Sequence, residues 1–403
     1  MRIGLMFGSD KERPPAARLE GVVGEAAAAE GQGFTSFWFP QVPGYLDAMT
    51  VLTVVGRATG RIELGTAVVP IQSRHPVPMA QQALTTQMAC GGRFTLGLGV
   101  SHHWIVEDQW GLPYGKPAAT MRDYLDVLDA AFAGPVRFDV ENATHRVHSP
   151  IDVDDRRPPP VLLAALAPVM LRLAGERASG TILWMADERA IGDFVVPRLS
   201  KVADDAGRPA PRVVARVPVA LCGDGEVADA QRVASEVLGH ADISPNYLAL
   251  LEHGDAEDVG DTMAAGDEAA ILERLGRYRD AGVTDLAARV VGLGGDPATR
   301  RPGSSRAAAP RRFWPPSPPS SERSAALVDP AVLHHEADVG GDGDVVGRVA
   351  GDGDDVGPAL RPEHGRRHLA APSRAARASS PRAMTRRCIS LVPSPITISG
   401  ASR

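Results

Sequence analysis

Short, continuous runs of apolar residues recur at regular intervals over residues 1–291. Runs of this kind, without polar alternation, are typical of parallel strands that are buried on both faces. Eight of them can be identified: Ile3–Phe7, Thr35–Phe39, Ile62–Val69, Phe94–Leu98, Val161–Ala165, Thr181–Trp184, Val213–Leu221 and Asp285–Val291.

Segments with helical spacing of apolar residues lie between these runs. The clearest stripe is in Thr120–Phe132, where Met121, Tyr124, Leu125 and Leu128 share one face. Further helices are predicted over about 19–30, 49–58, 79–89, 168–177, 191–202 and 271–278. Residues 135–157 break the rhythm with two short extended pieces, Val136–Val140 and His145–His148, which predict a hairpin over one end of the fold.

This order of segments predicts an α/β fold, specifically a parallel (β/α)8 TIM barrel over residues 1–294. An open doubly wound sheet is the rival interpretation, but the first strand lacks a GxGxxG turn and the strands number eight. No eighth amphipathic helix follows Val291, so the barrel is expected to have lost the helix that would cover its last strand.

The last hundred residues differ in composition from the rest. From Arg301 onward the chain has 15 Arg, no Lys, 13 Pro and two aromatic residues. Such a segment buries too little apolar surface to offset the entropy of ordering it, so residues 295–403 are predicted to form a disordered tail. GC-rich DNA read in a shifted frame would give the same composition, which is an alternative origin for the tail. Its Arg residues are interleaved with Asp, which disfavours nucleic-acid binding.

Composition narrows the class of protein. The chain has 403 residues, 43 Lys and Arg against 49 Asp and Glu, and 44% hydrophobic residues. The chain contains no run of ~18 apolar residues, the length needed to span a bilayer. The N-terminus turns polar at Ser9, too early for a signal peptide. These features predict a cytoplasmic protein with no membrane partner. The three Cys residues are far apart and no metal-ligand spacing occurs, so we expect neither disulfides nor a metal.

Several motifs together resemble one known family. The motifs are Arg74-His75-Pro76, Met79–Thr85 and Gly91–Gly99, extended by Gly65–Val69, Val161–Pro168 and Asp280–Asp285. Over about residues 1–291 they resemble the bacterial-luciferase-like superfamily, and the segments Phe37–Gln41 and Val100–His103 look most similar to its deazaflavin-dependent members.

The resemblance implies an oxidoreductase that binds coenzyme F420, or FMN as the alternative, at the carboxyl ends of the strands. It also implies a cis peptide bond at Ala67–Val68 behind the cofactor ring, and a cofactor phosphate near Ala165-Leu166-Ala167, where a helix begins at Pro168. An ordinary turn is the competing interpretation of that last segment.

Polar residues after the fourth strand are the candidate catalytic groups. His102 is expected nearest the reacting carbon and His103 second, because imidazole exchanges protons near neutral pH; hydrogen bonding within the loop is the alternative role. Gln41 stands where some relatives carry an acid, which leaves the proton donor open. The predicted cofactor-binding residues are Gln41, Ala67, Val68, Gly99, Ser101, His102, Ala165, Leu166, Ala167 and Trp184.

The predicted reaction is hydride transfer between the deazaflavin and a small organic acceptor, with the redox chemistry supplied by the cofactor. An FMN-dependent monooxygenase that activates oxygen and a non-catalytic flavin-binding barrel are the alternatives. Family members often dimerise, so the resemblance leaves a homodimer open.

Overall fold

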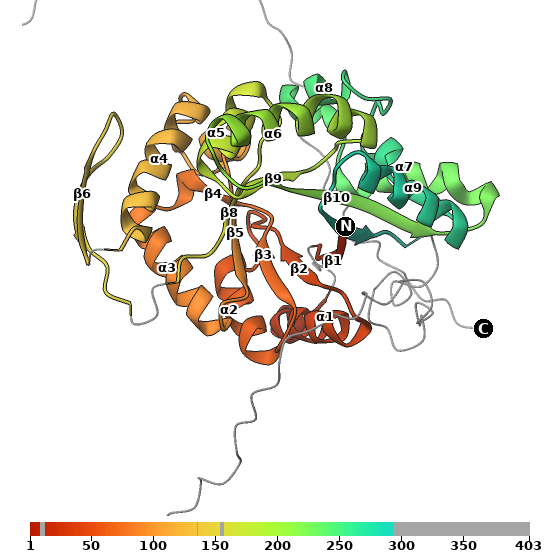
Figure 1. Ribbon diagram of the computed structural model, residues 1–403. Helices are drawn as coiled ribbons and strands as arrows, with labels where there is room; N and C mark the ends of the chain where they lie inside the picture. Colours follow the sequence, from red (N-terminus) through yellow and green to blue (C-terminus); the bar gives the residue numbers. More distant parts are fainter. Residues whose placement is uncertain (9–12, 135, 154–156, 293–403) are drawn as a thin grey trace, which may run out of the picture. The chain divides into compact units, whose positions relative to one another are not determined.

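Parallel strands close into a barrel in the computed structural model, which describes residues 1–8, 13–134, 136–153 and 157–292 (Figure 1). Each strand of the ring pairs with the next in parallel, and the last pairs with the first. The predicted (β/α)8 barrel is therefore confirmed. The eight strands of the ring are β1 (Arg2–Met6), β2 (Ser36–Phe39), β3 (Glu63–Thr66), β5 (Phe94–Gly99), β8 (Val161–Leu163), β9 (Gly180–Leu183), β10 (Arg212–Leu221) and β12 (Asp285–Val290).

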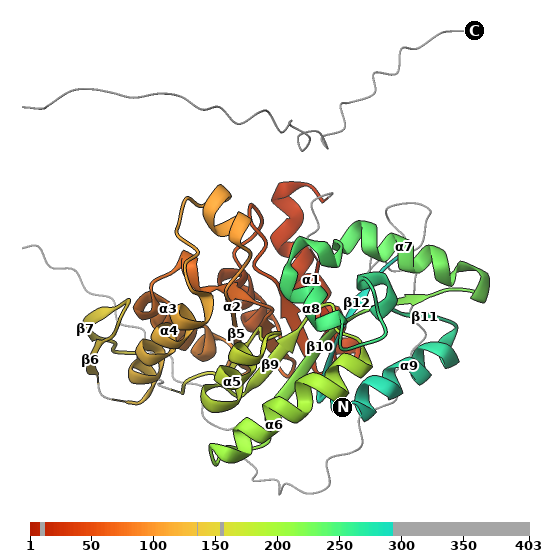
Figure 2. The ribbon, with the colours of Figure 1, turned by 90° about the horizontal axis from the view of Figure 1, so that it is seen from above.

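Helices surround the ring of strands (Figures 1 and 2). Local signals set their ends: Gly33, with φ of 92°, ends the first helix in the left-handed region, and the Asp47 carboxylate accepts a hydrogen bond from Thr50 N (3.0 Å) at the start of the second. Those described are α1 (Arg18–Gln32), α2 (Ala48–Ala58), α3 (Pro76–Ala89), α4 (Pro117–Phe132), α5 (Pro168–Arg177), α6 (Val196–Asp205), α7 (Val227–Leu238), α8 (Pro245–Leu251) and α9 (Glu268–Asp280).

Three features of the fold depart from the predicted pattern. The third apolar run is split, because β4 (Val69–Pro70) pairs with β5 separately from β3. A short strand, β11 (Ala264–Gly266), pairs with the outer end of β10, and its sequence Ala-Ala-Gly carries no strand signal. The predicted hairpin, β6 (Arg137–Glu141) and β7 (Arg146–Pro150), exists, but it packs beside α4 on the side away from the strands rather than over an end of the barrel (Figures 1 and 2).

The barrel interior is filled by large and small side chains that fit together. The buried side chains that pack together there are those of Met6, Trp38, Ala67, Leu162, Ile182, Val214 and Ala287. Trp38 is fully buried, and its indole Nε1 donates a hydrogen bond to Ser36 Oγ (2.9 Å). Trp38 lies opposite Gly65 in the β2–β3 register, so the smallest residue faces the largest. This packing makes the barrel a solid core rather than a pore.

A network of charges closes the amino-terminal end of the strands. Arg212 Nη1 lies 2.9 Å from Glu63 Oε1, and Arg212 Nη2 lies 2.9 Å from Asp285 Oδ1. Arg2 pairs with the same two carboxylates. Strands β1, β3, β10 and β12 are thus tied together where the barrel closes.

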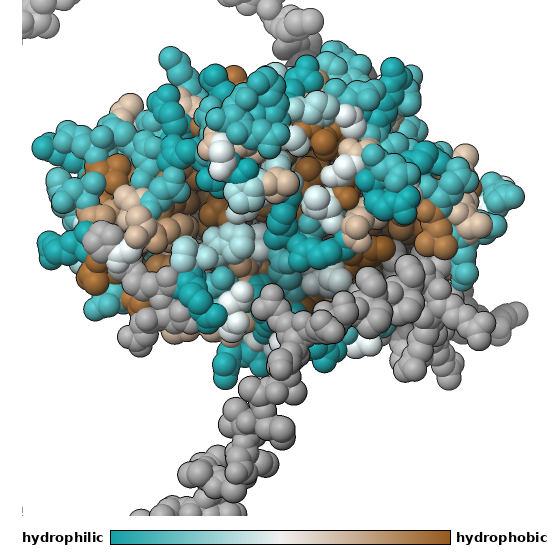
Figure 3. All heavy atoms as spheres, in the orientation of Figure 1, coloured by the Kyte–Doolittle hydropathy of each residue, from teal (hydrophilic) through white to brown (hydrophobic). Residues whose placement is uncertain are grey.

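Hydrophilic residues cover most of the face shown in Figure 3, and hydrophobic residues show between them without forming one continuous patch. Among the described residues, no helix has the length and apolar character needed to cross a bilayer. The predicted boundary at residue 294, the expected loss of the eighth helix and the predicted tail over 295–403 lie outside the described residues.

Candidate active site

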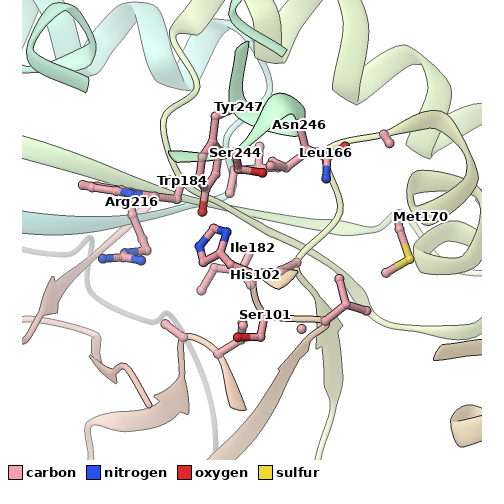
Figure 4. Close-up of a pocket in the computed structure, with 17 residues that line it drawn as sticks. Ser101, His102, Leu166, Met170, Ile182, Trp184, Arg216, Ser244, Asn246 and Tyr247 are labelled. Carbon is pink, nitrogen blue, oxygen red and sulfur yellow. The ribbon is translucent and has the colours of Figure 1, made fainter. Parts of the chain in front are cut away.

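A pocket lies at the carboxyl ends of β3, β5, β8 and β9 and reaches across to β10 and α8 (Figure 4). In (β/α)8 enzymes the loops at this end of the barrel carry the chemistry. Most of the residues predicted from the sequence meet here. Those that line the pocket are Ala67, Val68, Gly99, Ser101, His102, Leu166, Ala167 and Trp184.

The floor of the pocket is built where β3 and β5 run side by side. The peptide bond Ala67–Val68 is cis, as the family resemblance implied. Just below it, the Thr66 hydroxyl donates to the Gly97 carbonyl (2.9 Å) and accepts from the Gly97 amide (2.8 Å). A Cβ atom at Gly99 would lie 2.5 Å from Val68 Cγ2, so the glycine leaves the room that the Val68 side chain occupies.

His102 stands at the turn that follows β5. Ser101 has φ of 58°, a left-handed conformation that is uncommon outside glycine and that redirects the chain. The His102 carbonyl then accepts hydrogen bonds from Ile105 N (3.1 Å) and Val106 N (3.0 Å), which start the next helical turns. The backbone on both sides of His102 is thus fixed by local structure.

The His102 imidazole is enclosed by aromatic rings. The Trp104 ring stacks on it at a centroid distance of 5.8 Å. The Tyr247 ring, seen beside His102 in Figure 4, is tilted against it, also at 5.8 Å. Burial, with a smaller contribution from the nearby His103, lowers the pKa of His102 below its usual value. The imidazole is therefore neutral at pH 7, with one nitrogen as donor and the other as acceptor.

Three predicted residues lie outside the described lining of the pocket. His103 is exposed, with its ring against Tyr114 at 6.4 Å. The Gln41 side chain accepts a hydrogen bond from Ala48 N (2.9 Å) at the start of α2. Ala165 is packed in the core under the helices, while Leu166 and Ala167, next to it, line the pocket. The catalytic role predicted for His103 and the cofactor-binding roles predicted for Gln41 and Ala165 stay predictions.

The segment that leads into α5 and the first turn of this helix meet the pocket at Leu166, Ala167 and Met170. Pro168 begins the helix, and no side chain caps its N-terminus. Pro168 has no N–H and Leu171 N donates to the Ala167 carbonyl (2.9 Å), so the N–H groups of Val169 and Met170 are the ones available to a ligand.

The sequence-based prediction missed the wall formed by Arg216 and by α8. Arg216 interrupts the apolar run of β10, and a lone charge inside a buried strand was the signal that could have found it. Its Cζ lies 4.2 Å from the centre of the Trp184 ring. Tyr247, with Ser244 and Asn246, reaches the pocket from the segment between β10 and β12.

Curated relatives resemble part of the chain. A protein of Mycobacterium tuberculosis, whose name assigns it provisionally to the coenzyme F420-dependent oxidoreductases, is 31% identical over 207 residues, which make up 48% of this chain and 58% of the relative. The chain thus spans less than two thirds of that relative's length. The 5,10-methylenetetrahydromethanopterin reductase of Methanolobus tindarius is 26% identical over 61% of this chain and 76% of its own.

Solved structures share the fold at low sequence identity. The coenzyme F420-dependent tetrahydromethanopterin reductase of Methanopyrus kandleri has a TM-score of 0.58 at 20% identity, with 73% of this chain and 94% of that chain covered. The oxygenating constituent of 3,6-diketocamphane monooxygenase from Pseudomonas putida, in complex with FMN, has a TM-score of 0.58 at 16% identity. The match covers 72% of this chain and 92% of that chain.

A family model covers most of the barrel directly. Residues 1–285 match that of the luciferase-like monooxygenases. Together with the closed barrel, this match shows that the chain belongs to the luciferase-like monooxygenase family.

Proposed function

We propose that this enzyme transfers a hydride between coenzyme F420 and a small organic acceptor. The observation that carries the proposal is the meeting, in one pocket, of the Ala67–Val68 floor, the neutral His102 imidazole and the uncapped start of α5. The name of the M. tuberculosis relative and that of the M. tindarius reductase support this choice of reaction class.

The residues present fit a planar tricyclic cofactor. The floor consists of small or apolar groups (Ala67, Val68, Gly99 and Ala164), against which a flat ring can lie. The free N–H groups of the first turn of α5 and its helix dipole suit a phosphate. When bound, the deazaflavin supplies the hydride, and the protein supplies position and a proton path.

His102 would handle the proton that accompanies the hydride. Its neutral imidazole can donate a hydrogen bond to a carbonyl oxygen, or accept the proton of a hydroxyl in the reverse direction. Trp104 and Tyr247 contact the imidazole and hold its ring in position. This arrangement favours His102 over the exposed His103 as the group that touches the acceptor.

Cofactor binding tests the proposal. The protein is titrated with oxidised coenzyme F420 and, separately, with oxidised FMN, and quenching of cofactor fluorescence is followed. We expect saturable binding of coenzyme F420 to the wild type. Gly99→Ala should weaken it about tenfold, because the new methyl group displaces the Val68 side chain from the floor.

Gly24→Ala is the matched control, since Gly24 is exposed on α1 and an added Cβ meets nothing within 4 Å. It should bind like the wild type. Binding of FMN without binding of coenzyme F420 would overturn the proposal in favour of an FMN-dependent monooxygenase. Flavin binding without turnover of any acceptor would support a non-catalytic barrel.

A further inference from the structure

Among the described residues, none pairs with the Arg216 guanidinium as a counter-ion at the pocket wall. Its Nε is buried and has no hydrogen-bond partner, and in the part of the chain that the structure describes none of the residues lining the pocket is acidic. A buried charge is costly unless it is paired, so a cation held in this way favours an anionic ligand.

In the described parts of the chain, the other charged residues do not compensate Arg216. Arg289, on the neighbouring strand β12, adds a second positive charge, and burial lowers the pKa of both guanidinium groups, that of Arg216 to about 10. The carboxylates of Glu63 and Asp285 belong to Arg2 and Arg212 at the other end of the barrel. Arg212 is four residues earlier in β10, about 13 Å away at the rise of a strand.

Two aromatic residues surround Arg216 from different elements. Trp184, after β9, lies under the guanidinium at 4.2 Å, a cation–π distance. Tyr247, on α8, is close enough for its hydroxyl to interact electrostatically with Arg216, and the Tyr247 ring also contacts His102. A guanidinium fixed on an aromatic face presents its planar fork of donors at little cost in side-chain entropy.

We propose that Arg216 binds an oxyanion group of the substrate, and that the enzyme acts on small molecules that carry a carboxylate. A carboxylate matches the guanidinium fork with two parallel hydrogen bonds. Since Tyr247 links Arg216 and His102, a substrate anchored at Arg216 has its reacting carbon on the His102 side of the pocket. The assignment of this anion to the substrate depends on the proposed function; the anion site itself does not.

Benzoate and its neutral isostere benzamide are the probes, and isothermal titration calorimetry with the full chain is the measurement. We expect the wild type to bind benzoate, and to bind benzamide with an affinity at least about tenfold lower, because only benzoate forms charge-assisted hydrogen bonds. Arg216→Met should weaken benzoate binding by at least about tenfold. Arg216→Lys should restore only part of it, since an ammonium lacks the fork.

Arg198→Met is the matched control. The Arg198 guanidinium also lies over an aromatic ring, that of Phe194 at 3.9 Å, but outside the described lining of the pocket. This variant should bind benzoate like the wild type, and circular dichroism melts check that all variants are folded. Equal binding of benzoate and benzamide, wild-type affinity for benzoate in Arg216→Met, or no benzoate binding to the folded wild type at millimolar concentrations would each overturn the proposal.

Titration of the same variants with the cofactor distinguishes whether the anion that binds Arg216 belongs to the substrate or to the cofactor. Unchanged coenzyme F420 affinity in Arg216→Met, with lost benzoate binding, supports the substrate as the source. Loss of both would assign Arg216 to the phosphate or carboxylates of the cofactor and overturn the substrate assignment. If neither F420 nor FMN binds but benzoate binding still requires Arg216, the proposed function fails while the anion site stands.

Discussion

The Trp38 ring occupies the space that any side chain at Gly65 would need. The two residues are directly opposite in the β2–β3 pair, and a Cβ atom at Gly65 would lie 2.1 Å from the ring. Gly65→Ala therefore forces the indole or the strands apart, and we expect it to lower the free energy of unfolding by about 1–3 kcal/mol. Urea denaturation measures the change. Gly24→Ala, on the exposed face of α1, should instead raise stability by about 0.5–1 kcal/mol.

The charge network at the amino-terminal end of the barrel should matter for stability and not for binding. Asp285 is 1% exposed and pairs with both Arg2 and Arg212. Asp285→Asn leaves these guanidinium groups short of one counter-ion and should lower the free energy of unfolding by roughly 2 kcal/mol or more.

Affinity for coenzyme F420 or FMN should not change in Asp285→Asn, because the pocket is at the opposite end of the strands. Asp139→Asn is the control: its carboxylate pairs with the exposed His148 on the hairpin and should contribute less than about 0.5 kcal/mol. A large loss of cofactor affinity in Asp285→Asn would show that the two ends of the barrel are coupled.

His102 should make the fold less stable in mild acid. Burial lowers its pKa in the folded protein, whereas in the unfolded chain it keeps a pKa of about 6.5. As the pH falls below that value, the unfolded state takes up a proton before the folded state does, so stability decreases until the pH reaches the folded pKa. His102→Gln should lose less stability between pH 7 and pH 5, as measured by thermal melting.

His240 provides a control of opposite sign. Its hydrogen bond to Asp258 raises its pKa in the folded protein, so its contribution is present at low pH and is lost as the pH rises through that value. His240→Gln should therefore lose more stability in acid than the wild type. A melting profile of His102→Gln that parallels the wild type would contradict the burial of the His102 imidazole.

His102 should also matter more than His103 for turnover. If His102 moves the proton, His102→Gln should lower kcat by about a hundredfold and leave the dissociation constant of coenzyme F420 within about a factor of three. His103→Gln, on an exposed ring, should stay near wild-type activity. The reverse order of effects would assign the proton to His103.

The sequence predicted the barrel well because its strands are buried on both faces. Continuous apolar runs identified all eight strands of the ring, and Pro168 marked the start of α5, as observed. The family motifs also anticipated the cis bond at Ala67–Val68. The strands and the helix start depend on local sequence, so a single chain is enough to find them, whereas the cis bond was expected only from the family resemblance.

The rest of the pocket depends on contacts between distant segments. Arg216 could be identified as an unusual residue, but its position beside Trp184 follows from the β9–β10 register, which a single sequence does not specify. Tyr247 lies on the seven-residue helix α8, too short for a helical period to stand out. Ala165 was predicted to bind the cofactor together with Leu166 and Ala167. Successive side chains of an extended segment point to opposite faces, and the Ala165 side chain is packed in the core.

The segment that carries Ser244, Asn246 and Tyr247 lies between β10 and β12, outside the ring of paired strands. This wall of the pocket is therefore not needed to close the barrel, whereas the floor is fixed by the hydrogen bonding of the sheet. Residues 244–247 could be exchanged for those of another family member to reshape this wall of the pocket, and the closure of the barrel would stay untouched.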